Sequence, residues 1–222
     1  MTSVQADFDR LALLDSEGWT ANNHYHNYLL RFIPQNCANA MEVGCGTGAF
    51  SRRLAERSQS VIALDLSPEM IRMARSRSTQ FPNINFQLGD AMLQEFATSH
   101  FDCVCSIATL HHLHQRELLV KFKEALKPGG VLIVLDLVAS SQGREVIQDL
   151  IATGVSCSLR LIHNGALRPP PEVRTAWEAH GNRDSYSSIN EIRSLCAELL
   201  PGAAVKRHLL WRYSLIYQKP AL

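Results

Sequence analysis

The chain has 222 residues, of which 46% are hydrophobic and 19% are charged, a composition typical of a globular protein rather than a disordered or fibrous one. Lys and Arg total 22 against 21 for Asp and Glu, so the net charge of +1 gives no overall attraction for nucleic acid or for an anionic membrane. The longest apolar run, Val131–Leu135, is far shorter than the roughly 20 residues that cross a bilayer, and the start MTSVQADFDR has no apolar signal core, so we expect a cytoplasmic protein without nucleic-acid or membrane partners.

Apolar residues switch repeatedly between helical and strand spacing along the chain. A helical stretch over residues 5–33, interrupted near Gly18, precedes the first strand. Five strands are predicted at Ala40–Val43, Val61–Asp65, Ile84–Leu88, Phe101–Ile107 and Val131–Val138. Amphipathic helices lie between them, and one begins with the serine cap and first-turn proline of Ser67-Pro68. This order predicts a parallel sheet with helices on both faces, a three-layer doubly wound α/β fold.

The region after the fifth strand departs from this alternation. Residues 143–181 are predicted to be helical, with the prolines at 169–171 starting a second, shorter helix. A helix near Ile189–Leu200 and extended runs at Ala204–Leu210 and Tyr213–Tyr217 then complete the sheet. No linker divides the chain, so we expect a single domain over residues 1–222. Its parts are a helical cap (1–36), a core (37–140), a helical insertion (141–186) and a closing helix with two strands (187–222).

Cysteine usage is informative because the chain is long enough to build a core without cross-links. Its six cysteines form no C-x-x-C pair. We therefore expect reduced and mostly buried thiols.

A glycine-rich turn, MEVGCGTGAF, joins the first predicted strand to the next helix. Glycines 44, 46 and 48 let a ligand approach the backbone closely, in front of a helix N-terminus. Asp65 ends the second strand, where a carboxylate binds both hydroxyls of a ribose. The G-x-G-x-x-G/A pattern alone leaves NAD and S-adenosylmethionine open. Glu42, expected to point into the cleft, favours the cofactor with a cationic amino acid group, S-adenosylmethionine.

Four further segments follow in a fixed order: Asp65, LGDAM, HFDCVCSIATLHHLH and LKPGGVLIV. With them the sequence resembles the class I S-adenosylmethionine-dependent methyltransferases over residues 22–138, and more weakly through WRYSLIYQK. The resemblance implies a Rossmann-like seven-stranded sheet of order 3-2-1-4-5-7-6, with strand 7 antiparallel and the cofactor across strands 1, 2 and 4. LKPGG is expected to form the turn into strand 5. The implied cofactor-binding residues are Glu42, Gly44, Cys45, Gly46, Gly48, Asp65, Leu66, Asp90, Ala91, Met92, Ser106 and Ile107. Tyr25 and His26, on the helix before strand 1, either cover the amino acid end of the cofactor or pack that helix onto the sheet edge.

Methyl transfer from a sulfonium is a direct displacement that yields S-adenosylhomocysteine and requires the protein mainly to aim the reactants. His111 and His112 follow strand 4 and are the candidates for a catalytic base, with a role in shaping the substrate site as the alternative. No metal site is expected, since the histidines at 24, 26, 111, 112 and 114 lack a fixed ligand spacing.

The insertion corresponds to the roof over the acceptor in this family, so we expect it to act as a substrate lid. Its candidate residues hold a planar or anionic acceptor, or else lie on solvated helix faces; they are Arg160, His163, Arg168, Arg174, Trp177 and His180. Residues 106–109 lack the Asn/Asp-Pro-Pro-Tyr motif of enzymes acting on nucleobases or protein glutamine. The prediction is therefore a methyltransferase acting on a small molecule. The alternatives are an NAD-dependent oxidoreductase and a non-catalytic adenosyl-ligand-binding protein.

Overall fold

The computed structural model describes residues 3–139, 145–181 and 184–221, built around one seven-stranded sheet. Its strands run in the order β3-β2-β1-β4-β5-β7-β6, and β7 is antiparallel to both of its neighbours while the remaining pairs are parallel. This confirms the predicted order and the antiparallel strand. The strands are β1 (Cys37–Val43), β2 (Ser58–Asp65), β3 (Ile84–Leu88), β4 (Phe101–Ile107), β5 (Leu126–Leu137), β6 (Ala204–Arg207) and β7 (Arg212–Gln218).

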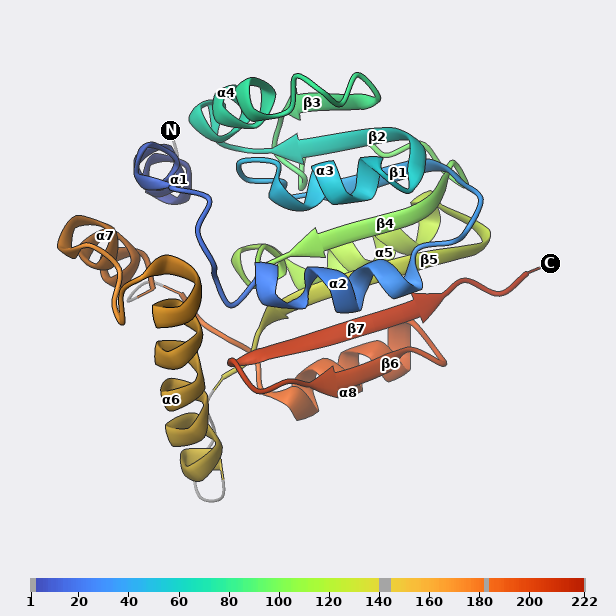
Figure 1. Ribbon diagram of the computed structural model, residues 1–222. Coiled ribbons are helices and arrows are strands. Elements are labelled where there is room, and N and C mark those ends of the chain that lie inside the picture. The colour runs from blue at the N-terminus through green and yellow to red at the C-terminus, as the bar shows by residue number, and fades with distance from the viewer. Residues whose placement is uncertain (1–2, 140–144, 182–183, 222) are drawn as a thin grey trace.

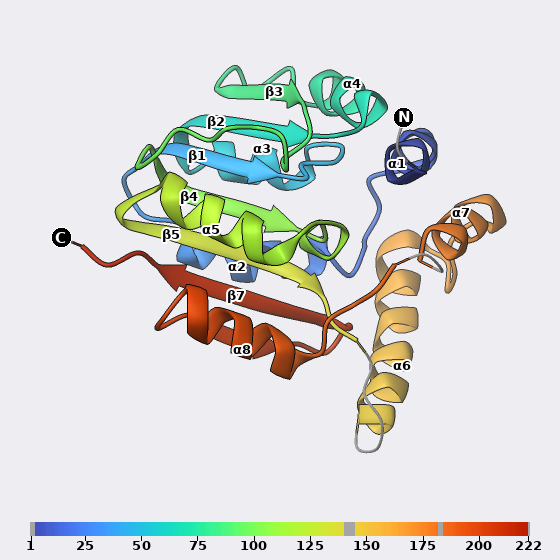
Figure 2. The ribbon, with the colours of Figure 1, turned by 180° about the vertical axis from the view of Figure 1, so that it is seen from behind.

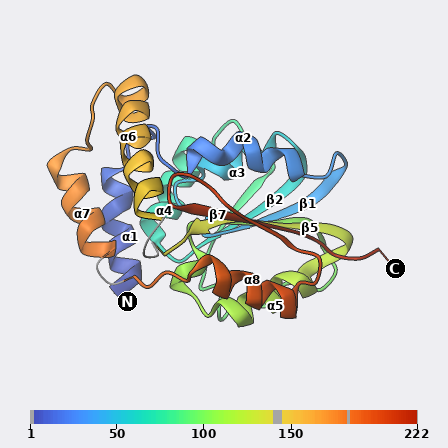
Figure 3. The same ribbon diagram turned by 90° about the horizontal axis from the view of Figure 1, so that it is seen from below.

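Helices cover both faces of the sheet, as a doubly wound fold requires (Figure 3). One apolar core lies under α2 and α3, and a second lies under α5 and α8. Figures 1 and 2 show these two helical layers from opposite sides. The helices are α1 (Ser3–Leu14), α2 (His26–Leu29), α3 (Ala49–Ala55), α4 (Pro68–Arg77), α5 (Gln115–Ala125), α6 (Glu145–Asn164), α7 (Pro171–Gly181) and α8 (Ile189–Leu199), with short 3-10 turns η1 (Asn23–Tyr25), η2 (Leu30–Phe32) and η3 (Leu110–His112).

Helix starts follow the local sequence. Ser67 caps α4, because its hydroxyl accepts a hydrogen bond from the Met70 N–H at 3.0 Å, and Pro68 occupies the first helical position. Ser188 and Glu191 form a reciprocal capping box at the start of α8. The predicted start of α4 is therefore confirmed.

Several strand boundaries differ from the prediction: β1 and β2 each begin three residues earlier, at Cys37 and Ser58, and β7 is one residue longer at each end. The two largest differences are in β5 and β6. β5 begins at Leu126 rather than at residue 131, so the LKPGG segment lies inside the strand instead of leading into it. The strand accommodates this glycine pair because its register against β4 shifts after Phe101 and because the Gly129 N–H donates to the Lys219 carbonyl at 2.9 Å. β6 ends at Arg207 because the chain turns back there, with the His208 N–H donating to the Arg212 carbonyl at 2.7 Å.

Three helices, α1, α6 and α7, gather beyond the carboxyl ends of the parallel strands (Figures 1 and 2). α1 packs against α4 and α7 through Leu11, Ala12, Met70 and Ala176. The N-terminal cap and the insertion therefore meet at the edge of the sheet where a parallel α/β fold binds ligands. The predicted boundary between core and insertion, at residues 140 and 141, lies outside the described residues.

The cysteines are as expected: all six are free, five are buried and Cys157 is partly exposed. Among the described residues, no helix is both long and apolar enough to cross a membrane.

Candidate active site

The glycine loop after β1 is held against the end of β2. The N–H groups of Gly44 and Cys45 donate to the Leu64 carbonyl at 2.8 and 3.0 Å, and the Gly46 N–H donates to Asp65 Oδ2 at 2.7 Å. Gly44, Gly46 and Gly48 all have positive φ angles, of 77°, 52° and 79°, which glycine adopts without strain. The loop therefore needs glycine at each of these positions for its backbone path alone.

The three glycines differ in what surrounds them. A Cβ on Gly44 would lie 1.9 Å from Thr109 Oγ1, and one on Gly48 would lie 3.1 Å from the Phe86 ring. These two glycines therefore allow close packing of protein against protein. A Cβ on Gly46 would meet no atom within 4 Å. Gly46 thus faces open space at the carboxyl edge of the sheet, where a ligand can approach the backbone.

Asp65 lies beside this open space. Its second carboxylate oxygen accepts a hydrogen bond from the Ser67 N–H at 2.9 Å, so the side chain is fixed between the glycine loop and the start of α4. Burial raises the pKa of Asp65, an effect that the backbone donors at Ser67 and Gly46 oppose. A carboxylate held in this way presents its remaining lone pairs in a fixed direction.

The LGDAM segment reaches the same edge. The Gly89 N–H donates to the Asp65 carbonyl at 2.9 Å, and the Asp90 carboxylate accepts a hydrogen bond from the Met92 N–H at 2.8 Å. Ala91 is buried against the second core. Leu66, between β2 and α4, and Ile107, at the end of β4, are partly exposed. The structure thus places these predicted residues at the edge where β2, β3 and β4 end.

Glu42 is buried, and its carboxyl accepts a hydrogen bond from the Ser51 hydroxyl of α3 at 2.5 Å. Burial raises the pKa of Glu42 to about 8, with a smaller contribution from Asp65. A nearby cation favours the ionised form of such a carboxyl. On the neighbouring strand, Ser106 is fully buried, and its hydroxyl has no hydrogen-bond partner among the described residues.

The open space over Gly46, the fixed carboxylate of Asp65 and the unpaired Ser106 hydroxyl fit a cationic adenosyl cofactor.

Tyr25 and His26 lie in packing contacts. The Tyr25 hydroxyl accepts a hydrogen bond from the Leu210 N–H at 3.3 Å, and the His26 ring meets the Phe50 ring edge-on at 5.0 Å. Burial lowers the pKa of His26 to about 4, with a contribution from Arg53.

His111, in η3 directly after β4, is bound by a buried carboxylate. Its Nδ1 lies 2.6 Å from Asp136 Oδ1 and its backbone N–H donates to Asp136 Oδ2 at 2.8 Å. The Leu137 N–H also donates to Asp136, which is fully buried. Nδ1 is therefore directed at this carboxylate, and Nε2 is the ring nitrogen that faces Asp184.

His112 and His180 converge on Asp184, so the insertion reaches the histidines of strand 4. His112 Nδ1 lies 3.3 Å from Asp184 Oδ1, His111 Nε2 lies 3.9 Å from Asp184 Oδ2, and His180 Nε2 lies 3.5 Å from the same oxygen. The Tyr186 hydroxyl donates to Asp184 at 3.1 Å. Burial, together with His111, lowers the pKa of His112 to about 4.

The other predicted lid residues lie in separate places on α6 and α7 and in the segment between them. Arg160 and His163 lie over Trp19, with the guanidinium carbon 5.9 Å from the indole centroid and the two rings stacked at 6.4 Å. Arg174 pairs with Glu178 on the surface of α7. The ring centroid of Trp177 lies 5.8 Å from that of His180, and Arg168 is exposed.

Sequence reasoning missed Asp136 and Asp184. Asp136 did carry a signal, because it is a lone charge in the apolar strand sequence VLIVLDLV and such a buried charge needs a partner. No feature of the sequence around Asp184 indicated a role for it. Arg212 was also missed: it is partly buried beside Asp136, and its Nε donates to Asn22 Oδ1 at 2.7 Å. Burial lowers the pKa of Arg212 to about 10, an effect that Asp136 opposes.

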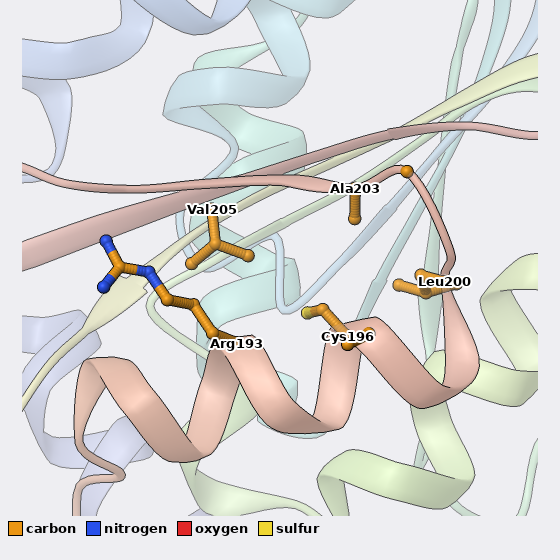
Figure 4. A pocket seen from close by; sticks show the side chains of 7 residues that line it. Arg193, Cys196, Leu200, Ala203 and Val205 are labelled. Atoms are coloured by element: carbon orange, nitrogen blue, oxygen red, sulfur yellow. The ribbon is translucent and has the colours of Figure 1, made fainter.

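A hollow of about 340 Å³ lies elsewhere, between α8 and the start of β6 (Figure 4). Arg193 and Cys196 from α8 and Ala203 and Val205 from the following chain line it. It contains none of the predicted site residues.

The molecule is thus a three-layer α/β protein with a glycine loop, two acids and a histidine cluster at one edge of its sheet. A family model described as a methyltransferase domain matches residues 40–130. An uncharacterized methyltransferase of Mycobacterium bovis is 30% identical over 208 residues, which cover 91% of this chain and 98% of that protein. The trans-aconitate 2-methyltransferase of Deinococcus radiodurans is 39% identical over 109 residues, covering 48% of this chain and 41% of that protein.

Solved structures agree on the fold. The N-methyltransferase NodS of Bradyrhizobium japonicum, determined with S-adenosyl-L-homocysteine, has a TM-score of 0.65 at 16% identity and covers 99% of this chain and 100% of its own. The phosphoethanolamine N-methyltransferase 2 of Haemonchus contortus has a TM-score of 0.69 at 15% identity, over 99% of this chain and 61% of its own. The chain belongs to the class I S-adenosylmethionine-dependent methyltransferase family. This decides between the two cofactors that the glycine loop alone left open.

Proposed function

We propose that this enzyme transfers the methyl group of S-adenosylmethionine to a small-molecule acceptor that binds between the glycine loop and the α6–α7 insertion. The observation that carries the proposal is the juxtaposition of two features at one sheet edge. One is the open face of Gly46 beside Asp65, and the other is the His111–Asp136 pair after β4. The bound cofactor supplies a methyl group on a sulfonium whose charge already activates the leaving thioether.

On the cofactor side, Asp65 would bind the ribose hydroxyls and Gly46 would let the ligand lie against the loop. Glu42 would ionise when a cationic amino acid group arrives, because that charge offsets the burial that now favours its protonated form. The remaining predicted contacts belong to the same proposal: Gly44, Cys45, Gly48, Leu66, Asp90, Ala91, Met92, Ser106, Ile107, Tyr25 and His26.

On the acceptor side, His111 or His112 would accept the proton from the nucleophilic atom of the acceptor. Asp136 fixes the ring of His111, so that its Nε2 faces Asp184 rather than turning freely. The acceptor would be covered by residues 141–186, since α7 supplies His180 to the same cluster. Holding acceptor and methyl donor in line accounts for most of the acceleration that such a reaction needs.

The experiment has a binding arm and a turnover arm. Titration calorimetry of the full chain should show micromolar binding of S-adenosylhomocysteine and no heat with NAD; absence of adenosyl-ligand binding refutes the cofactor site. For turnover, the protein is incubated with S-adenosylmethionine labelled in its methyl group and with either the ultrafiltrate or the macromolecular fraction of a cell extract. Label should enter the ultrafiltrate. Label confined to macromolecules overturns the small-molecule acceptor, and binding without any transfer indicates a non-catalytic adenosyl-ligand-binding protein.

The role of the histidines is tested separately. His111→Ala should lower kcat while the affinity for S-adenosylhomocysteine stays unchanged, and His100→Ala, at the opposite end of β4, is the matched control. An equal loss of cofactor affinity in His111→Ala would indicate a packing role instead.

A further inference from the structure

The histidines after β4 do more than line the acceptor side, because each is directed at a carboxylate from the insertion. Among the described residues, one group of histidine and acidic side chains lies close enough together to hold a metal ion, and it consists of His111, His112 and Asp184. One ligand atom from each lies within 4.8 Å of the others. We propose that these three residues form a binding site for a divalent transition-metal ion such as Zn²⁺, with a coordination position left open toward the acceptor.

The distances are close to those that a metal imposes. Two ligands on one tetrahedral Zn²⁺, each at about 2.1 Å, lie about 3.4 Å apart. His112 Nδ1 and Asp184 Oδ1 are 3.3 Å apart, and His111 Nε2 and Asp184 Oδ2 are 3.9 Å apart. The ligand atoms of all three residues lie within 4.8 Å of one another, so side-chain movements of up to about 1.4 Å would complete the geometry.

The outer contacts also match those of metal-binding histidines, which usually donate their second ring nitrogen to a carboxylate or carbonyl. His111 does so to Asp136, whose side chain is itself fixed by two backbone N–H groups, from His111 and Leu137. The ligand Asp184 is contacted in turn by the Tyr186 hydroxyl and by His180 Nε2, which lie 3.1 and 3.5 Å from its Oδ2. The ring of His180 is positioned by Asp7, with Nδ1 3.3 Å from Asp7 Oδ2.

Charge and burial favour a cation at this place. The side chains of His111, His112 and Asp184 are 4%, 7% and 7% exposed, so little water shields the charge of the carboxylate. Two imidazoles with one carboxylate are a ligand set that suits Zn²⁺ or Fe²⁺ rather than Mg²⁺ or Ca²⁺, which prefer oxygen ligands. Three protein ligands with one open position are typical of catalytic rather than structural metal sites.

The ligands come from two parts of the chain, η3 after β4 and the segment after α7. A bound ion would therefore tie the insertion to the sheet edge and hold an acceptor oxygen or nitrogen in its open position. Because the ion would occupy the lone pairs of His111 Nε2 and His112 Nδ1, it would take the place of a histidine base in activating the acceptor. The binding site follows from the histidine and aspartate geometry alone, whereas its part in catalysis rests on the proposed methyl transfer.

The experiment is calorimetric titration of the chelator-treated full chain with ZnCl₂, together with the visible absorption of the Co²⁺-substituted protein. We expect one ion per chain. His112→Ala and Asp184→Asn should each weaken binding at least tenfold, and Asp136→Asn, which removes the outer carboxylate, should weaken it by about 10–100-fold. His100→Ala is the control for adventitious binding to a surface imidazole and should leave affinity unchanged.

Circular dichroism checks that each variant folds, and Asp184→Asn lies outside any helix or strand, so at least one ligand variant is expected to fold. Absence of one-to-one binding in the unmodified protein, or binding that His112→Ala and Asp184→Asn leave intact, overturns the proposal. Titration of the same samples with S-adenosylhomocysteine separates the two hypotheses. Adenosyl-ligand binding without metal binding refutes the metal site alone, and the converse refutes the cofactor site alone.

Discussion

The glycine loop offers a controlled test of the cofactor site, because the chain contains a second glycine in the same situation elsewhere. Gly46 and Gly129 both have positive φ angles, of 52° and 79°, and a Cβ on either would meet no atom within 4 Å. They differ in location: Gly46 lies at the carboxyl edge of the sheet, and Gly129 lies in β5 beside the Lys219 carbonyl. Gly46→Ala and Gly129→Ala therefore introduce the same kind of backbone strain, and only the first places a methyl group in the proposed cofactor space.

The expected magnitudes follow from this comparison. An alanine in the left-handed region costs about 1–2 kcal/mol, and in a chain of this size 1 kcal/mol lowers Tm by about 2–4 °C. Both variants should thus lose about 2–8 °C in Tm. Gly46→Ala should in addition bind S-adenosylhomocysteine at least tenfold more weakly, a loss of about 1.4 kcal/mol or more, while Gly129→Ala should bind as the unmodified protein does.

Calorimetric titration and thermal denaturation of the two variants make the measurement, and the Tm values establish that their strain is equal. If Gly46→Ala binds S-adenosylhomocysteine with unchanged affinity, the ligand does not lie against this loop. If both variants lose affinity equally, the loss comes from general destabilisation, and the inference from open space to cofactor is wrong.

Three further predictions follow from the geometry. Gly44→Ala would place Cβ 1.9 Å from Thr109 Oγ1, so its Tm should fall further than that of Gly129→Ala in the same thermal scan; an equal fall would show that the loop can shift. Because the pKa of Glu42 is about 8 in the folded chain against an ordinary value of 4.5, the folded state binds more protons between these values and its stability falls as pH rises. Glu42→Gln should remove roughly 2 kcal/mol or more of that fall between pH 5 and pH 8 in urea unfolding, and parallel curves for the two proteins would contradict the raised pKa. Asn164 joins α6 to the backbone of Trp19 by hydrogen bonds of 2.8 and 3.0 Å, so Asn164→Ala should speed amide exchange in α6 but not in α8; equal protection in both proteins would refute this attachment.

The sheet could be predicted because its signals are local. The apolar runs, the serine cap of α4 and the glycine loop each depend on a few neighbouring residues, and together they indicated the correct class of fold. The start of β5 was misplaced because the LKPGG segment reads as a turn when taken alone. Only the bond from the Gly129 N–H to the Lys219 carbonyl, 90 residues further along the chain, shows why it continues the strand.

The signals for the proposed cofactor residues were likewise local, since these residues follow strand ends in a recognisable order. The acceptor side was predictable only in part. His111 and His112 could be placed after β4, but their partners Asp136 and Asp184 lie 25 and 72 residues further along the chain. No spacing rule connects such residues, so the absence of a ligand motif in the sequence said little about a metal site.

Glu42 and Asp136, the two buried acids of this sheet edge, differ in the partners that surround them. Glu42 is buried, and the burial outweighs the opposing effect of Arg52 on its pKa, so the protonated form is favoured until a further positive charge arrives. Asp136 is equally buried but has three hydrogen-bond partners, the Nδ1 and backbone N–H of His111 and the backbone N–H of Leu137. A positive ligand would therefore favour the ionised form of Glu42, whereas Asp136 already has His111 as its partner and orients that ring so that Nε2 faces Asp184. Under the proposed function, the same edge of the sheet thus separates a place for a cationic cofactor from a place that prepares the acceptor.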